Sequence, residues 1–198
     1  PQKELVGTLN EVLFSPEDLQ LVKGSPSLRR RFMDMEISQV NPAYYRLLLQ
    51  YNRAVSQRNL LLKQMKYEGR ASLEEWDRQI ASFAAAIVRR RLDALRKMSF
   101  LAGVIHRRLT GGSELLTMDY VQPYGGITDA QAYYDLLQEH RQDDIYRMST
   151  SIGPHRDDLS LAVGGADLKK YGSQGQQRTA VLALKLSELE YMKSETGE

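Results

Sequence analysis

The feature that most constrains the fold of this chain is the stretch 42–109, which has helical hydrophobic spacing on both sides of one break, Glu68-Gly69-Arg70. Before the break, apolar side chains recur three or four positions apart, interrupted by Arg58: Tyr44, Leu48, Tyr51, Val55, Leu62 and Met65. After it a second run does the same: Trp76, Ile80, Phe83, Ile87, Ala94, Met98, Leu101 and Ile105. If unbroken to Leu109, this second helix spans about 50 Å. Because a short connection leaves two long helices antiparallel and side by side, the sequence predicts a helical arm.

Polar residues mark where other helices begin. Ser15-Pro16-Glu17-Asp18 places a serine at an N-cap, a proline in the first turn and acids near the positive end of the helix dipole. Four further starts are predicted: Ser25-Pro26, Asn41-Pro42, the capping-box sequence Ser72-Leu73-Glu74-Glu75, and Thr128-Asp129. The helix after Asp129 reaches His140, and its extension to Met148 stays open.

Short runs of β-type residues lie between these helices. They cover residues 11–14, 115–121 and 159–163, and the last two end near the glycine pairs Gly125-Gly126 and Gly164-Gly165. The expected fold class is therefore mainly α with small β elements, an α+β protein.

The segment Gly172-Ser173-Gln174-Gly175-Gln176-Gln177-Arg178 directly precedes an apolar helical run that contains neither glycine nor proline until Gly197. Ser173 is therefore expected at or near an N-cap. A serine hydroxyl, the unpaired N–H groups of a first turn and the positive end of the helix dipole converge there, and Gly175 lets a ligand approach the backbone closely. Such a segment can hold a phosphate. The alternative is an ordinary capped helix after a glycine turn.

This segment resembles the signature Leu-Ser-Gly-Gly-Gln of ABC-type ATPases. It keeps Ser173, Gly175 and Gln176 and carries Gly172 and Gln174 in the other two positions. In that superfamily the signature closes over the γ-phosphate of the ATP held by a second subunit. The resemblance therefore implies a phosphate contact made only in a dimer.

Three motifs follow one another along the chain. The longest is Pro16-Glu17-Asp18-Leu19-Gln20-Leu21-Val22-Lys23-Gly24-Ser25-Pro26-Ser27-Leu28-Arg29-Arg30-Arg31-Phe32-Met33-Asp34. It resembles, at every position, the signature of the RecF family of bacterial recombination mediators. The others are Gly153-Pro154-His155-Arg156-Asp157-Asp158 and the segment around Ser173. The resemblance spans residues 5–198.

The resemblance implies an organisation and a function. Segments 1–40 and 151–198 would belong to an ABC-type ATPase head, 41–110 to the helical arm, and 111–150 to a strand and helix that complete the arm. RecF proteins bind ATP and Mg²⁺, form an ATP-dependent homodimer, and have a weak DNA-dependent ATPase. They act on double-stranded and gapped DNA with RecR and RecO in recombinational repair, DNA replication and the SOS response. Ser173, Gln174, Gly175 and Gln176 would contact the nucleotide of the opposite subunit.

The ATP-binding elements themselves are missing from the sequence. There is no Gly-x-x-x-x-Gly-Lys-Ser/Thr loop, and no strand ending in paired acids follows the signature helix. The family places these elements before residue 1 and after residue 198. The chain is therefore expected to be an interior fragment that contains no catalytic residue and does not hydrolyse ATP alone.

Composition excludes several other classes. The chain has no cysteine, and its three histidines lack paired ligand spacing, so we expect no disulfide and no metal site. No apolar run approaches the about 20 residues of a membrane span, and the start is no signal peptide. A cytoplasmic protein without membrane contact is expected.

Arginine clusters provide the candidate DNA contacts, although the formal net charge is only +2. On a helix, three consecutive arginines such as 89–91 fan over about 200° and cannot form one flat patch. A solvated face is the alternative to phosphate contact. Because RecF proteins bind DNA, the resemblance implies six candidates: Arg29, Arg30, Arg89, Arg90, Arg107 and Arg108.

Two acidic segments have alternative roles. Glu17 and Asp18 either belong to a lever that senses ATP, as the resemblance to ABC-type ATPases implies, or cap a helix. The loop around His155 and Asp157 combines general acid and base groups, but a surface turn tied by an arginine-to-aspartate bridge is the commoner arrangement.

Two other functional classes stay open. A non-ATPase helical scaffold would bind a partner protein through Tyr44, Tyr45 and Tyr51. An SMC-like subunit would need a much longer coiled coil at residues 68–70, which the immediate turn disfavours.

Overall fold

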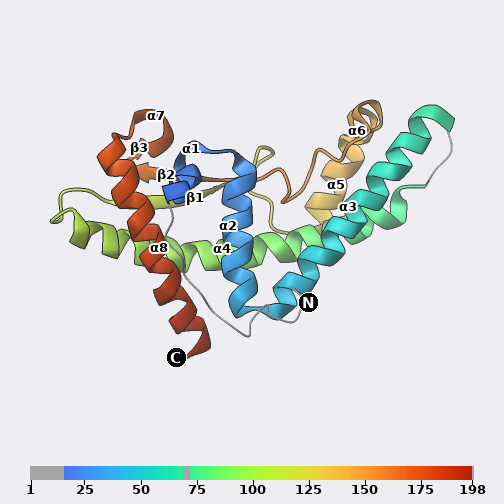
Figure 1. The fold of residues 1–198 in the computed structure, drawn as a ribbon. Coiled ribbons are helices and arrows are strands. Elements are labelled where there is room, and N and C mark those ends of the chain that lie inside the picture. The colour runs from blue at the N-terminus through green and yellow to red at the C-terminus, as the bar shows by residue number, and fades with distance from the viewer. Residues whose placement is uncertain (1–15, 69–71, 198) are drawn as a thin grey trace. The chain divides into compact units, whose positions relative to one another are not determined.

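The computed structural model describes residues 16–68 and 72–197, and shows a mainly helical chain with one three-stranded antiparallel sheet (Figure 1). The described residues form two compact units. We call residues 16–42, 91–121 and 158–197 the sheet unit, and residues 43–90 and 122–157 the hairpin unit. The mainly helical fold class predicted from the sequence is confirmed. The predicted strand at 11–14 lies outside the described residues.

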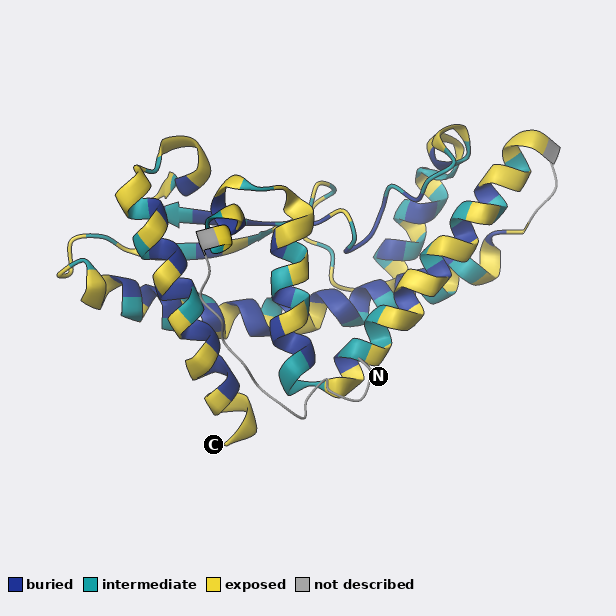
Figure 2. Cartoon of the chain, viewed as in Figure 1, coloured by how far each residue is buried: buried dark blue, intermediate teal, exposed yellow. Residues whose placement is uncertain are grey.

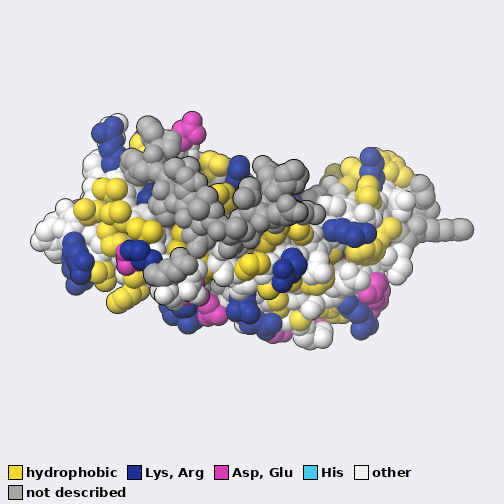
Figure 3. Space-filling model, turned by 60° about the horizontal axis from the view of Figure 1, so that its bottom comes forward, with side chains coloured by type: hydrophobic (Ala, Val, Ile, Leu, Met, Phe, Trp, Pro, Cys, Tyr) yellow, Lys and Arg dark blue, Asp and Glu magenta, His cyan; other side chains and the backbone are white. Residues whose placement is uncertain are grey.

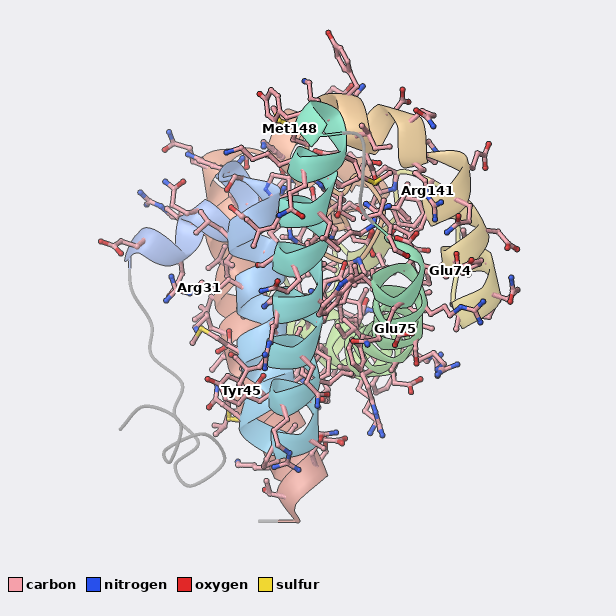
Figure 4. All side chains as sticks on the ribbon, turned by 90° about the vertical axis from the view of Figure 1, so that its right-hand side faces the viewer. Arg31, Tyr45, Glu74, Glu75, Arg141 and Met148 are labelled. Atoms are coloured by element: carbon pink, nitrogen blue, oxygen red, sulfur yellow. The ribbon has the colours of Figure 1, made fainter. Side chains whose placement is uncertain are left out.

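The hairpin unit is built on the two predicted long helices, α3 (Pro42–Glu68) and the first part of α4 (Glu74–Leu109). Helix α4 begins at Glu74, so Leu73 rather than Ser72 precedes it, and the predicted capping box set the start one residue too early. The Asp77 N–H donates to the Leu73 carbonyl at 2.8 Å. Figure 4 labels Glu74 and Glu75 in this first turn.

The predicted hydrophobic stripes form the core of the hairpin unit. Figure 2 shows buried residues following one side of the helices. The largest buried side chains from both stripes and the following helix are Tyr44, Tyr51, Leu62, Ile80, Ile87, Tyr133 and Leu137. Because Tyr44 and Tyr51 are only 1% and 2% exposed, they cannot present the binding surface that the scaffold alternative required.

The predicted helix after Asp129 is two helices, α5 (Ala130–Glu139) and α6 (Arg141–Arg147). The Asp129 carboxylate accepts from the Ala132 N–H, as an N-cap does, at 2.9 Å. His140 is the C-cap of α5, and Met148, whose φ of 53° lies in the left-handed region, is the C-cap of α6. The extension to Met148 therefore exists, but as a separate short helix.

The sheet unit has the strand order β1-β2-β3, formed by β1 (Leu116–Val121), β2 (Asp158–Val163) and β3 (Ala166–Asp167). Strands β1 and β2 are the two predicted strands that lie in the described residues. Their alternate residues Leu116, Met118, Leu159, Leu161 and Val163 are buried, as expected for a sheet with one covered face. Strand β3 was missed, although Gly164 and Gly165, with φ of 57° and 81°, are typical of a two-residue hairpin turn.

Helices surround this sheet. The chain enters through a 3-10 turn, η2 (Pro16–Leu19), and α1 (Gln20–Lys23), and continues into α2 (Pro26–Val40). After β3 come α7 (Leu168–Tyr171) and the long helix α8 (Gln174–Thr196). Helix α2 contacts both β2 and α8, and α8 also contacts η2, α1 and α7, so α8 is packed within the sheet unit. None of the helices in the described ranges is long and apolar enough to cross a bilayer.

Candidate functional site

The N-terminus of α8 is closed by the predicted serine. The Ser173 hydroxyl oxygen accepts from the Gln176 N–H at 3.2 Å, and the Gln176 side-chain oxygen accepts from the Ser173 N–H at 2.9 Å. This reciprocal pair is a capping box. The sequence-based assignment of Ser173 as the N-cap is therefore confirmed.

The cap leaves hydrogen-bond donors for a ligand. A serine hydroxyl has one donor and two acceptor sites, and the cap uses only an acceptor site. Ser173, Gln174 and Gly175 are all exposed, and a Cβ placed on Gly175 would meet no atom nearer than the Ser173 oxygen at 3.9 Å. Together with the positive end of a long helix dipole, this arrangement can accept a phosphate oxygen.

Two glutamines fix the loop before α8. The Gln176 side-chain amide donates to a Glu114 carboxylate oxygen at 2.7 Å, which links the loop to the segment before β1. Gln177 is buried and donates to the carbonyls of Leu168 and Gly172 at 3.1 and 3.3 Å. Glu114 was missed from the sequence, because nothing in its local pattern indicates a partner 62 residues away.

Gly172 replaces the leucine of the ABC signature for a steric reason. A Cβ at this position would lie 2.5 Å from the Leu168 carbonyl oxygen and 2.6 Å from its side chain. Only glycine therefore fits between α7 and Ser173. Arg178, one turn into α8, is exposed.

Further along α8, two buried glutamates face each other across the contact with α2. Glu36 is 3% exposed and Glu188 is 1% exposed. The Lys185 ammonium donates to one Glu188 oxygen at 2.7 Å. Glu36 Oε2 and Glu188 Oε1 have no hydrogen-bond partner among the residues that the structure describes.

Burial changes the protonation of this pair. It raises the pKa of Glu36 to about 7, against the opposing charge of Lys185. Burial and the neighbouring Glu36 raise the pKa of Glu188 to about 8, and Asp18 on η2 contributes in the same direction. The pair therefore holds a proton near neutral pH. Asp18 is half-buried, whereas Glu17 beside it is exposed.

The first arginine cluster contains one structural member. Arg29 is 6% exposed, and its Nε and Nη2 donate to the two Asp158 oxygens, both at 2.8 Å. Its Nη1 donates to the Gly24 carbonyl at 3.0 Å. Arg29 thus joins α2 to the start of β2. Arg30 is half-buried, and Arg31, labelled in Figure 4, is exposed.

The second arginine cluster, residues 89–91, has one buried and two exposed members, as expected for consecutive residues that fan around a helix. Arg91 is 2% exposed and donates to both Asp34 carboxylate oxygens at 2.9 Å and to the Tyr120 hydroxyl at 3.0 Å. Arg89 and Arg90 are exposed. In the third cluster, Arg107 and Arg108 are both exposed near the end of α4.

The predicted surface turn at His155-Arg156-Asp157-Asp158 is wrong. Arg156 donates to the Thr150 carbonyl and the Ser149 hydroxyl rather than to a neighbouring aspartate. Asp158 pairs with Arg29 instead, 129 residues away. Asp157 is fully buried and accepts from the Tyr124 hydroxyl at 2.6 Å.

The same motif holds the hairpin unit together through His155. Its Nε2 donates to the Thr150 carbonyl at 3.0 Å, so its Nδ1 accepts from the Tyr51 hydroxyl at 2.6 Å. Gly153 has a φ of 134°, and a Cβ there would lie 2.2 Å from that hydroxyl oxygen. This network supports a structural role. Within the described ranges, no group of three or more His, Cys, Asp and Glu side chains is placed to hold a metal ion.

Comparison with known proteins finds that the chain is similar to part of the RecF proteins. No family model matches the chain. The DNA replication and repair protein RecF of Halothermothrix orenii is 45% identical over 205 residues, which is 98% of this chain and 55% of the relative. RecF of Alkaliphilus oremlandii is 46% identical over 202 residues, with the same coverage, and RecF of Clostridium perfringens is 43% identical over 196 residues, covering 98% and 54%.

Solved structures agree with these relatives. A structure of the recombination mediator protein RecF-ATPrS in the RecFOR pathway matches with a TM-score of 0.93 and 36% identity, covering 100% of this chain and 55% of that chain. A RecF-ATP structure in the same pathway matches with a TM-score of 0.93 and 37% identity, covering 98% and 54%. The chain therefore spans about half the length of the RecF proteins it matches.

Proposed function

The chain is a partial RecF-like chain, and from this premise we propose that it forms the arm and the signature-motif part of a RecF-type recombination mediator. The observation that carries the proposal is the N-terminus of α8, where Ser173 caps the helix and keeps its hydroxyl proton for a ligand. Such a protein acts on DNA in recombinational repair and replication.

The proposed organisation follows the sequence segments. Segments 1–40 and 151–198 belong to the ATPase head, 41–110 forms the arm, and 111–150 completes the arm. The antiparallel helices of the hairpin unit supply a rigid arm, and the sheet unit supplies the base on which the signature helix α8 is held.

Ser173, Gln174 and Gly175 contact the γ-phosphate of an ATP bound by the opposite subunit. The residues fit this role because the helix terminus offers a hydroxyl and backbone N–H groups and no side chain covers it. Gln176 holds the cap through Ser173 and Glu114. ATP and Mg²⁺ are held mainly by parts of the protein outside this segment, so the segment alone does not hydrolyse ATP. Glu17 and Asp18 form a lever that responds to the nucleotide.

Exposed arginines contact DNA phosphates. Arg89, Arg90, Arg107 and Arg108 are exposed and Arg30 is half-buried, which supports their assignment to double-stranded and gapped DNA. Arg29 is left out of this set because Asp158 and a backbone carbonyl occupy its guanidinium. RecR and RecO are the proposed protein partners, in the cytoplasm.

The test is Ser173→Arg in the complete RecF-type protein, measured by sedimentation with and without ATP. A bulky cation at this position blocks the opposing γ-phosphate, so we expect ATP affinity to be retained and the ATP-dependent dimer to be lost. Ser82→Arg is the matched control, since Ser82 is also exposed on a helix. A dimer that still forms normally with Ser173→Arg would mean that this loop only caps a helix.

A further inference from the structure

A groove runs along the outer side of the second part of α4, between that helix and the segment that leads into β1. It has a volume of about 610 Å³ and lies wholly within the sheet unit. Its apolar lining includes Phe100, Val104 and Leu115, which are 71%, 37% and 44% exposed. Contiguous exposed apolar patches rimmed by polar residues are typical of interaction sites. On the face drawn in Figure 3, hydrophobic side chains gather in patches with Lys and Arg side chains among them.

The floor of the groove is fixed. The Met118 N–H on β1 donates to the Ser99 hydroxyl on α4 at 3.1 Å. At Gly103 the helix approaches the Leu116 carbonyl so closely that a Cβ would lie 3.1 Å from its oxygen. Helix α4 therefore covers this edge of β1, and an added strand cannot pair there. An occupant has to insert side chains instead.

The charged side chains that line the groove are of one sign. Arg96, Arg107 and Arg108 line it, and its lining contains no aspartate or glutamate. Arg96 has only an exposed contact with Asp93 at 3.6 Å, which contributes little in water. Arg107 and Arg108 form no ion pair with the side chains that the structure describes.

We propose that this groove docks an acidic amphipathic segment of a partner protein, with its apolar side chains on Phe100, Val104 and Leu115 and its carboxylates against Arg107 and Arg108. This is the arrangement in which a helical segment lays its apolar face into a groove. The lining favours a peptide over an unstacked nucleobase, because Phe100 is the one aromatic side chain among the described residues that form it, whereas base-binding surfaces use several aromatic rings.

The proposal goes beyond the proposed function and shares two arginines with it. Arg107 and Arg108 can contact either DNA phosphates or the carboxylates of a peptide. Phe100 separates the two, because phosphate contact does not need it and peptide docking does.

The experiment measures binding of a fluorescent synthetic peptide, with leucines on one helical face and glutamates on the other, to the complete protein by anisotropy. We expect Phe100→Ser to lower peptide affinity about tenfold and to leave affinity for gapped DNA unchanged. Arg107→Glu should weaken both. Tyr171→Ser is the control, because Tyr171 is 75% exposed in the same unit and does not line the groove.

Three outcomes would overturn the proposal. The first is a wild-type protein that does not bind the peptide, which would mean that another part of the complete protein fills the groove. The second is equal peptide binding by the wild type and Phe100→Ser. The third is a loss of gapped-DNA affinity in Phe100→Ser as large as in Arg107→Glu, which would assign the groove to nucleic acid.

Discussion

Each unit buries one cluster of charged side chains, and the two clusters differ in how far their charges balance. In the hairpin unit, Arg58 donates to Asp77 and Asp144, both at 2.6 Å, and Arg141 donates to Asp77 at 2.8 Å. Two cations thus meet two anions, and Thr150 accepts a further bond from Arg58. In the sheet unit, Glu36 and Glu188 are buried beside one cation, Lys185.

The difference shows which unit responds to its surroundings. The network in the hairpin unit fixes the mutual positions of α3, α4 and α6 through its ion pairs. An excess of buried acid is relieved by taking up a proton, so its stability depends on pH. Of the acid cluster in the sheet unit, Glu188 and Lys185 lie on α8, the helix that carries the candidate phosphate site. We therefore call the hairpin unit the frame, because its ion pairs fix three helices. We call the sheet unit adjustable, because its stability depends on pH through the buried acid pair.

Removing the centre of the balanced network should have the largest effect. Arg58→Ala leaves Asp77 and Asp144 fully buried without their shared cation. We expect a loss of about 3–5 kcal/mol in the free energy of unfolding, measured by urea denaturation. Arg78→Ala is the control, because its pair with Glu74 is exposed and should contribute less than about 1 kcal/mol. Equal losses in the two variants would contradict the description of the hairpin unit as a charge-held frame.

The next effect tests the backbone of that frame. Gly153→Ala puts a Cβ 2.2 Å from the Tyr51 hydroxyl oxygen at a φ of 134°, where side chains are rarely tolerated. We expect a loss of about 2–3 kcal/mol and rupture of the bond between Tyr51 and His155. Gly111→Ala is the control, since its φ is 64° and no atom lies within 4 Å. It should cost about 1 kcal/mol. A similar loss in both would mean that the Gly153 contact is not rigid.

Periodicity and capping rules predicted the helices and the Ser173 cap, because these depend on residues a few positions apart. The same rules treated Arg58 as an interruption of an apolar stripe, although it is the centre of the buried network. The arginine clusters and the family resemblance made Arg29 a candidate DNA contact, although it pairs with Asp158 across 129 residues. Partners this far apart are brought together only by the tertiary fold, so no local pattern indicates them.

The acid pair predicts how the stability of the sheet unit changes with pH. The pKa values of Glu36 and Glu188 rise from 4.5 in the unfolded chain to about 7 and about 8 in the folded one. Between these values the folded state binds more protons, so the stability that the pair contributes is complete below about pH 4.5 and is lost as the pH rises to about 8. We expect a progressive loss of the free energy of unfolding from pH 5 to pH 8, measured by urea denaturation at pH 5, 6, 7 and 8.

Other groups also titrate over this range, so Glu188→Gln is the comparison. Glutamine has the shape of the protonated glutamate side chain and does not ionise between pH 5 and pH 8. The variant should therefore gain stability relative to the wild type as the pH rises. A difference between the two proteins that stays constant from pH 5 to pH 8 would mean that Glu188 is not protonated in the folded state. The stability of the sheet unit would then not depend on pH through this pair.

The smallest effect concerns the bond that fixes the candidate site within the adjustable unit. Glu114→Ala removes the acceptor of the Gln176 side-chain amide, while the cap between Ser173 and Gln176 keeps its own two bonds. Without this hydrogen bond, the ordered conformation of the loop before α8 becomes less stable by about 1 kcal/mol relative to its other conformations. In the complete protein we expect about five times more ATP to be needed for half-maximal dimerisation, with unchanged ATP affinity of the monomer and an unchanged melting temperature. Glu114→Gln should restore the wild-type value, because its side-chain oxygen accepts the same bond.

If Ser173→Arg abolishes the dimer and Glu114→Ala does not weaken it, the cap alone orders the loop. The adjustable character of the sheet unit then does not extend to the start of α8.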